Sequence, residues 1–218
     1  MKIEEANKEF WMSVFHDIKN PMISIDFALR GVGSVEVDVE ILEDVYNLNL
    51  GNLEFIRAIL ENYRFEEGFF EKKHENINLK EFLNELVGGY KYILQEKELR
   101  IDLDGVEEDL VLNSCPISIS RVFSNLITNA AKFAPDGTEI MVEARPYNDS
   151  RGGGVFIAIT NYGEKIEDLK SIFKKFTSYT DSSGLGLYIC RKIVNDFGGE
   201  IWAENFDDGV KFCIVLKG

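Results

Sequence analysis

The chain has 218 residues, with 24 Lys and Arg against 38 Asp and Glu, so its formal net charge is −14. A hydrophobic content of 45% and a charged content of 28% are typical of a globular protein and exclude a disordered or fibrous chain. The acidic balance disfavours nucleic acid and anionic membrane surfaces as partners, because both are bound largely through Lys and Arg.

The first third of the chain is predicted to form a helical hairpin. Its first helix has apolar residues at alternating spacings of four and three, namely Trp11, Phe15, Ile18, Met22, Ile25 and Leu29. Gly31 and Gly33 interrupt this pattern, and residues 41–63 then carry two neighbouring apolar rows. A hairpin of about 60 residues is near the size limit for an isolated core, so we expect two copies to pair as a four-helix bundle. The alternative is that the hairpin packs against the rest of its own chain.

The remainder of the chain follows a mixed pattern after a polar stretch at 65–78, which is predicted to be a linker. Asn78 and Glu81 occupy capping-box positions at the start of a predicted helix. The helices are expected at 79–96, 117–133 and 185–197, with short helical turns near 167–175. The strands are expected near 99–104, 110–113, 138–146, 154–160, 200–205 and 210–216. This mixture predicts an α/β sandwich with one helical layer, so the whole chain is of the α+β class.

Cysteine usage and hydropathy indicate the compartment. The three cysteines are widely spaced and include no CxxC pair, which is typical of neither a disulfide framework nor a zinc site. No apolar run approaches the roughly 18 residues needed to span a bilayer. We therefore expect a cytoplasmic location without direct membrane insertion of this chain.

The first motif is FHDIKNP, residues 15–21, on the first predicted helix. His16 follows the apolar position Phe15 and so points roughly 100° away from the apolar face. Asp17 is adjacent and Asn20 lies one turn further on. A carboxylate that binds one ring nitrogen leaves the other with a free lone pair and raises its basicity, which is the arrangement a nucleophilic imidazole needs.

The second motif is RVFSNLITNAAKFAPDG, residues 121–137. Asn125, Asn129 and Lys132 share one helical face, at positions i, i+4 and i+7. A carboxamide oxygen suits Mg²⁺ and an ammonium suits a phosphate. Because asparagine is a poor helix former, its recurrence indicates a site. A merely solvated face is an equally good reading of these residues alone.

The third motif is SSGLGLYICRKIV, residues 182–194, which follows IFKKF at 172–176. Gly184 and Gly186 come directly before or at the start of the predicted helix. Glycines at a helix amino terminus let backbone N–H groups approach an anion. The Ser- and Thr-rich stretch between the two motifs is predicted to be a mobile loop.

These three motifs, in this order, resemble the catalytic core of two-component sensor histidine kinases. FHDIKNP resembles the H box of the dimerisation and histidine-phosphotransfer domain, and RVFSNLITNAAKF resembles the N box. IFKKF and SSGLGLYICRKIV resemble the F and G2 boxes of the GHKL-type ATP-binding domain. The resemblance covers nearly the whole chain and implies a helical dimerisation domain at 1–75 and a catalytic ATP-binding domain at 76–218.

The resemblance also implies roles for individual residues. His16 would be the phosphoacceptor and Asp17 its general base, while Asn20 would place water for dephosphorylation of the partner. Asn129 would be the Mg²⁺ ligand. The residues implied to lie around ATP are Asn125, Asn129, Lys132, Phe133, Asn161, Gly163, Lys175, Gly184 and Gly186.

One box departs from the family pattern Asp-x-Gly-x-Gly. This chain has Asn161 in place of the aspartate that accepts a hydrogen bond from adenine, and Lys165 in place of the second glycine. A carboxamide oxygen still accepts a hydrogen bond, but without the charge that strengthens it. Lys165 is expected to crowd the loop, and Gly163 retains the first glycine of the box.

The resemblance implies autophosphorylation of His16 from Mg-ATP and transfer of the phosphoryl group to an aspartate of a response regulator, with phosphatase activity in the reverse mode. The expected partners are a second copy of the chain and a receiver domain. One alternative is a phosphotransfer or scaffold protein with a degenerate ATP-binding domain, motivated by Asn161. Another is an ATPase of the chaperone or topoisomerase kind.

Overall fold

The computed structural model describes residues 73–149, 152–174, 177 and 184–217, together with Met22, Asn49 and Ile56. Apart from those three single residues, the described residues belong to one compact unit, Phe70–Thr177 with Gly184–Gly218. The predicted hairpin, with His16, Asp17 and Asn20, lies outside the described residues, as does Lys175. No helix among the described residues is long and apolar enough to cross a membrane.

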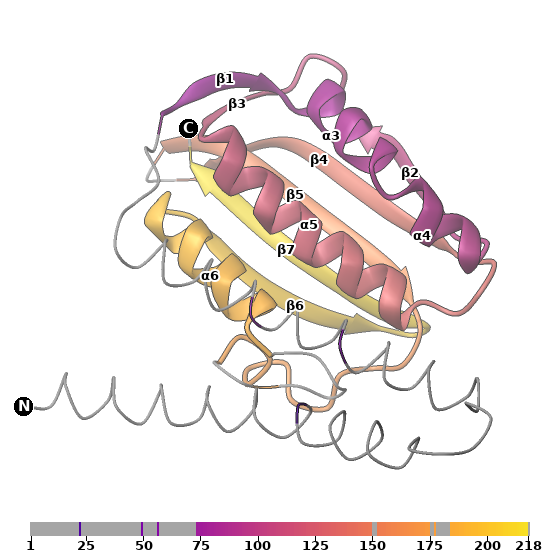
Figure 1. Ribbon diagram of the computed structural model, residues 1–218. Helices are drawn as coiled ribbons and strands as arrows, with labels where there is room; N and C mark the ends of the chain where they lie inside the picture. Colours follow the sequence, from indigo (N-terminus) through magenta and orange to yellow (C-terminus); the bar gives the residue numbers. More distant parts are fainter. Residues whose placement is uncertain are drawn as a thin grey trace, which may run out of the picture. The chain divides into compact units, whose positions relative to one another are not determined.

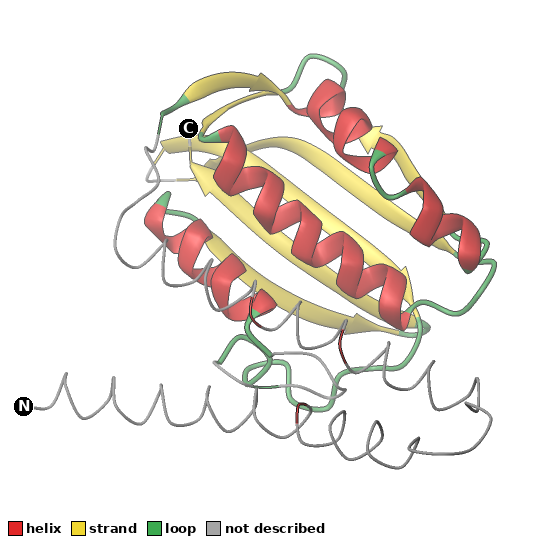
Figure 2. Ribbon diagram, in the orientation of Figure 1, coloured by secondary structure: helices red, strands yellow, loops and turns green. Residues whose placement is uncertain are grey.

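The unit is built on a five-stranded sheet in the order β2-β4-β5-β7-β6 (Figures 1 and 2). Its strands are β2 (Arg100–Val106), β4 (Glu139–Asp149), β5 (Gly152–Tyr162), β6 (Glu200–Phe206) and β7 (Gly209–Lys217). β2 runs parallel to β4, and the other pairs are antiparallel. Strands β5 and β7 are neighbours in the sheet but are far apart in sequence. The segment that connects them contains α6 and the edge strand β6.

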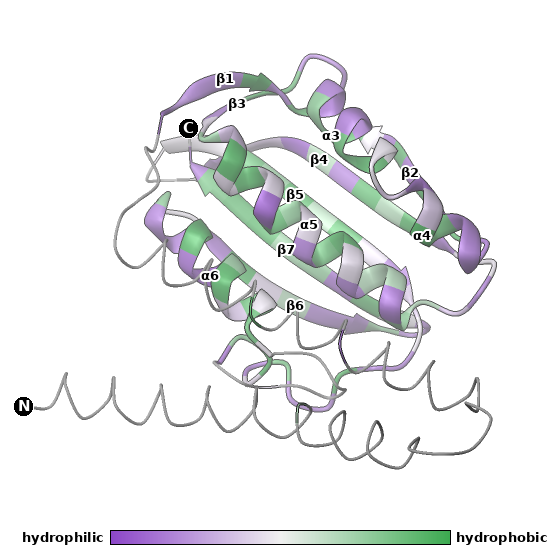
Figure 3. Cartoon of the chain, viewed as in Figure 1, coloured by the Kyte–Doolittle hydropathy of each residue, from purple (hydrophilic) through white to green (hydrophobic). Residues whose placement is uncertain are grey.

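Helices cover one face of this sheet (Figure 1). They are α3 (Leu79–Gly88), α4 (Lys91–Glu96), α5 (Pro116–Phe133) and α6 (Gly186–Asp196). α5 packs on β5 and on α6, and α6 packs on β6. The apolar side of α5 is fully buried, including Val122, Phe123, Leu126 and Ile127. Figure 3 shows that the central strands β5 and β7 are largely apolar, whereas hydrophilic and hydrophobic residues alternate along the helices. The one helical layer that the sequence predicts is confirmed.

The opposite face of the sheet is covered by its own long side chains. The Arg145 guanidinium lies 5.0 Å from the ring centroid of Phe156, and Lys211 Nζ lies 3.5 Å from Glu143 Oε2. Trp202 Nε1 donates a hydrogen bond of 2.6 Å to Glu204 Oε1. The first of these contacts joins the paired strands β4 and β5, the second joins β4 and β7 across β5, and the third lies within β6.

Two sequence predictions need correction near the start of this unit. Residues 75–78 were expected in the linker, but they form strand β1 (Glu75–Asn78), which pairs antiparallel with β3 (Val111–Ser114). Ile77 is buried by this pairing, which local composition does not reveal. The helix expected at 79–96 is two helices, because the chain turns at Gly89 and Tyr90. The predicted cap is present: Asn78 Oδ1 accepts a hydrogen bond of 3.2 Å from the Glu81 amide.

Candidate nucleotide site

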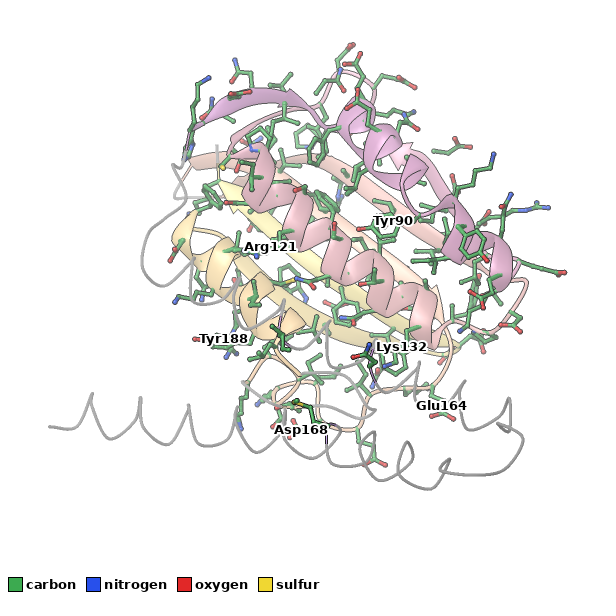
Figure 4. The ribbon with its side chains drawn as sticks, viewed as in Figure 1. Tyr90, Arg121, Lys132, Glu164, Asp168 and Tyr188 are labelled. Atoms are coloured by element: carbon green, nitrogen blue, oxygen red, sulfur yellow. The ribbon has the colours of Figure 1, made fainter. Side chains whose placement is uncertain are left out.

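The polar face predicted for residues 125–132 exists and lies along α5. The opposite side of the helix is held by burial against the sheet, so the polar side faces away from the core. Asn125 and Asn129 are half-buried, and Lys132 is exposed at the carboxyl end of the helix. Figure 4 shows Lys132 on the same side of the unit as Glu164 and Asp168, which belong to the segment after β5. The prediction that Asn125, Asn129 and Lys132 share one face of a helix is therefore confirmed.

The structure brings Asn125 together with the start of α6. A Cβ added to Gly186 would lie 3.2 Å from Asn125 Oδ1, so a larger residue there would press on this carboxamide. Cys190, one turn along α6, also contacts this region, and its Sγ lies 3.7 Å from the Val122 carbonyl oxygen. Burial raises the pKa of the Cys190 thiol to about 12, although a hydrogen bond with Asn125 opposes this shift. The second and third motifs thus meet at the contact between α5 and α6.

The end of α5 meets the segment that follows β5. Gly163 has a φ of +135°, and a Cβ at this position would lie 2.6 Å from the Phe133 carbonyl oxygen. Only glycine fits both the backbone conformation and the close approach. The Phe133 side chain remains 47% exposed, and Lys132 Nζ lies 5.9 Å from its ring centroid. An exposed aromatic ring beside an ammonium is suited to binding a planar, anionic ligand.

Asn161 lies on the helix-covered face of the sheet, at the end of β5. It is opposite Ile140 on β4 and Val210 on β7, and it is only 3% exposed. Its Nδ2 donates a hydrogen bond of 2.8 Å to the Tyr162 carbonyl oxygen. Because a carbonyl only accepts, this bond orients the amide and leaves Oδ1 as the acceptor. A hydrogen-bond acceptor is therefore present at the position where the family has its aspartate.

The loop after Gly163 is held in place without a second glycine. Asn205 clamps it: Oδ1 accepts from the Ile166 amide at 3.0 Å, and Nδ2 donates to the Ile166 carbonyl at 2.8 Å. Among the described non-glycine residues only Glu98 has a positive φ, so Lys165 is not strained. The side chain of Lys165 is exposed, and its crowding of the loop stays a prediction. No sequence signal pointed to Asn205, because its partner is 39 residues away.

The turn at 168–171, which leads into the F box, is stabilised by hydrogen bonds to Asp168. Asp168 Oδ1 accepts hydrogen bonds from the amides of Lys170 and Ser171. The hydrogen bond from the Ser171 hydroxyl is the main reason that the pKa of Asp168 lies below its usual value. The short turns predicted near 167–175 are present over the described part: the Ser171 amide donates to the Asp168 carbonyl oxygen at 3.2 Å, and the Lys174 amide donates to the Ser171 carbonyl oxygen at 2.9 Å. They do not extend into a regular helix, and Ile172 and Phe173 are buried. The Arg191 guanidinium lies 5.8 Å from the Phe173 ring centroid, so α6 helps to hold this segment.

These residues suit a magnesium nucleotide by their chemistry. Asn129 offers an uncharged oxygen ligand, Asn161 offers a buried acceptor for an amino group, and Phe133 offers an exposed ring. Gly184 has a φ of +61°, and Gly186 opens the amino end of α6, where the helix dipole favours an anion. The predicted site residues that the structure describes therefore lie around the carboxyl end of α5 and the amino end of α6.

Comparison with known proteins agrees with this geometry. Residues 115–218 match the model of the family described as histidine kinase-, DNA gyrase B-, and HSP90-like ATPase. Residues 115–218 are therefore similar to GHKL-type ATPase domains. The matched segment contains α5, α6 and the strands β4 to β7, and with them every described residue of the candidate site.

Relatives of the whole chain are sensor proteins and histidine kinases. The chain is 27% identical over 219 residues to the probable sensor protein PcoS of Escherichia coli, which covers 95% of this chain but only 46% of PcoS. It is 25% identical to histidine kinase ThkA in the crystal structure of its complex with response regulator protein TrrA, with a TM-score of 0.78 over 95% of this chain and 60% of that one. Acinetobacter baumannii histidine kinase AdeS shares the fold, with a TM-score of 0.75 at 19% identity, covering 93% of this chain and 97% of that chain.

Replacing Gly163 by alanine should lower the free energy of unfolding of the described unit by about 3 kcal/mol, the scale of a strained backbone combined with a clash in a packed region. Gly152→Ala is the matched control, since Gly152 has a φ of +130° but nothing within 4 Å of an added Cβ. Urea denaturation of both variants separates the two causes. Equal losses of stability in the two variants would show that the contact with Phe133 has no energetic weight.

Proposed function

We propose that this chain is a histidine kinase core that autophosphorylates His16 from Mg-ATP and passes the phosphoryl group to an aspartate of a response regulator. The observation that carries the proposal is the placement of Asn125, Asn129 and Lys132 on α5 beside the glycine-opened end of α6. This constellation occurs in the same chain as FHDIKNP, whose histidine, aspartate and asparagine suit a nucleophilic imidazole. Similarity over 95% of the chain to histidine kinase ThkA, in the crystal structure of its complex with a response regulator protein, supports both halves of the proposal.

Each residue then has a defined task. Bound ATP supplies the phosphoryl group, and Mg²⁺ offsets the phosphate charge. Asn129 ligates the metal, with Asn125 beside it, while Lys132 and Lys175 bring positive charge to an acidic protein. Gly184 and Gly186 let backbone amides approach the phosphates. Asn161 Oδ1 accepts from the adenine amino group, next to Gly163 and the ring of Phe133.

The chemical step belongs to the first motif. His16 attacks with the lone pair of Nε2, so that an N–P bond forms while the bond from phosphorus to the leaving oxygen breaks. Asp17 holds the proton on Nδ1 and stabilises the charge that develops on the ring. In the phosphatase direction Asn20 places water against the phosphorylated regulator. We further propose that residues 1–75 form a dimeric four-helix bundle, that 76–218 are the ATP-binding domain, and that the chain acts in the cytoplasm.

Incubation of the full chain with γ-labelled ATP and Mg²⁺ tests this proposal. We expect a label on the protein that is labile in acid and stable in alkali, as a phosphoramidate is, and that moves to an added receiver domain. Steady hydrolysis of ATP without such a label would instead indicate an ATPase of the chaperone or topoisomerase kind.

A second candidate function rests on Asn161. A neutral acceptor binds an amino group less strongly than a carboxylate does, which favours a phosphotransfer or scaffold protein with weak ATP binding. Calorimetric titration with Mg-ATP decides between the two. A lack of binding at millimolar nucleotide would favour the relay, in which His16 receives and gives phosphoryl groups without ATP.

A further inference from the structure

The carboxyl end of α5 is closed by a side chain from another element. The last carbonyl groups of a helix have no partner within the helix and must be satisfied elsewhere. The Ala130 carbonyl oxygen accepts from the Ala134 amide at 2.8 Å. Lys97 Nζ donates to the carbonyl oxygens of Ala131 at 3.1 Å, Lys132 at 2.9 Å and Ala134 at 3.4 Å.

Lys97 is well suited to this contact. Its ammonium has three N–H donors, and three carbonyl oxygens lie within reach. The negative end of the α5 dipole favours a cation at this place. The backbone of Lys97 is fixed as well, because its carbonyl oxygen accepts from the Gly137 amide at 2.9 Å and the next residues enter β2. Lys97 directly follows α4, and its ammonium contacts the carboxyl end of α5.

The remaining carbonyl group of this turn faces the other way. The Phe133 carbonyl oxygen lies against Gly163, where an added Cβ would be 2.6 Å from it. The last turn of α5 thus lies between the Lys97 ammonium, which donates hydrogen bonds to it, and the backbone of Gly163, which packs closely against it. This turn carries Lys132 and Phe133 and directly follows Asn129, and all three are candidate nucleotide contacts.

We propose that Lys97 is a positioning residue of the nucleotide site. By satisfying the carbonyl groups of the last turn, its ammonium fixes the direction in which Lys132 and Phe133 project and prevents this turn from fraying. Lys97 itself touches backbone and not ligand, so its influence on binding passes through α5. The inference rests on the proposed function, since it concerns the binding of a nucleotide at this end of the helix.

The test uses three full-length variants. Lys97→Met keeps the aliphatic stem and removes the charge and the donors. Lys97→Arg restores donors and charge, and Lys91→Met is the control, since Lys91 is an exposed lysine at the start of α4. Calorimetry with Mg-ADP measures affinity, and amide hydrogen exchange of the nucleotide-free chain measures the opening of α5.

Lys97→Met should weaken Mg-ADP binding roughly tenfold, the scale expected when binding groups are misplaced without being removed. Amides of residues 131–134 should exchange faster in this variant, while those in the middle of α5 should not. Lys97→Arg should recover most of the affinity, and Lys91→Met should match the unmodified chain.

The failures are distinguishable. An unmodified chain that does not bind Mg-ADP would overturn the proposed function and, with it, the role of Lys97 toward nucleotide. Binding by the unmodified chain with unchanged affinity in Lys97→Met would overturn the inference alone. Weaker binding with uniformly faster exchange along α5, unrescued by arginine, would also overturn it, because it indicates general loss of stability.

Discussion

His16→Ala is expected to abolish labelling of the chain by γ-labelled Mg-ATP, with a loss of at least about a thousandfold, because the substitution removes the nucleophile itself. Alanine cannot form the N–P bond that the proposed reaction requires. Binding of Mg-ATP should be unchanged, since the candidate nucleotide contacts lie in the second and third motifs. Labelling measures the loss of phosphoryl transfer, and calorimetric titration of the same variant measures whether Mg-ATP still binds.

The chain provides a matched control in its second histidine. His74 is exposed, and its ring lies edge-on to Phe197 at 5.4 Å between centroids. It has no neighbouring Asp-x-x-Asn pattern, so His74→Ala should label as the unmodified chain does. Label that persists in His16→Ala and disappears in His74→Ala would reverse the assignment of the phosphoacceptor.

Asn129→Ala should lower the affinity for Mg-ATP roughly a hundredfold, because the carboxamide oxygen assigned as the magnesium ligand is lost. Labelling of His16 should fall with it. The expected loss is smaller for ADP without Mg²⁺, since the carboxamide is assigned to the metal and not to the base. Calorimetric titrations with and without Mg²⁺ measure this difference.

Stability distinguishes a binding role from a structural one at Asn129. Alanine is a better helix former than asparagine, so the substitution should leave the free energy of unfolding unchanged or raise it by about 0.5 kcal/mol. Asn84→Ala on α3 is the control, because Asn84 is also a helical asparagine but is exposed and lies outside the candidate site. A loss of stability in Asn129→Ala alone would contradict the assignment to metal binding.

The parts of the fold that the sequence predicts are those set by local periodicity. α5 begins and ends within one residue of its predicted limits, because its apolar stripe is long and regular. The short strand β1 was missed, because its identity depends on pairing with β3, more than 30 residues further along the chain. Local pattern carries no information about such a partner.

The same distinction applies within the candidate site. Asn125 and Gly186 were expected to approach a common ligand, and the structure brings them together between α5 and α6. Asn205 and Lys97 were not expected, because a side chain that binds distant backbone groups follows no spacing rule. The hold on the loop that contains Lys165 could not be predicted either, because it comes from two hydrogen bonds between Ile166 and the distant Asn205.

The buried thiol of Cys190 has a practical consequence. Its raised pKa leaves almost no thiolate at neutral pH, and its fully buried position blocks reagents, so the folded domain should resist alkylation there. Exposure of the thiol to solvent requires a local opening of the contact between α5 and α6. Because Asn125 and Gly186 flank the same contact, the rate at which an alkylating reagent modifies Cys190 should report how often this part of the candidate site opens.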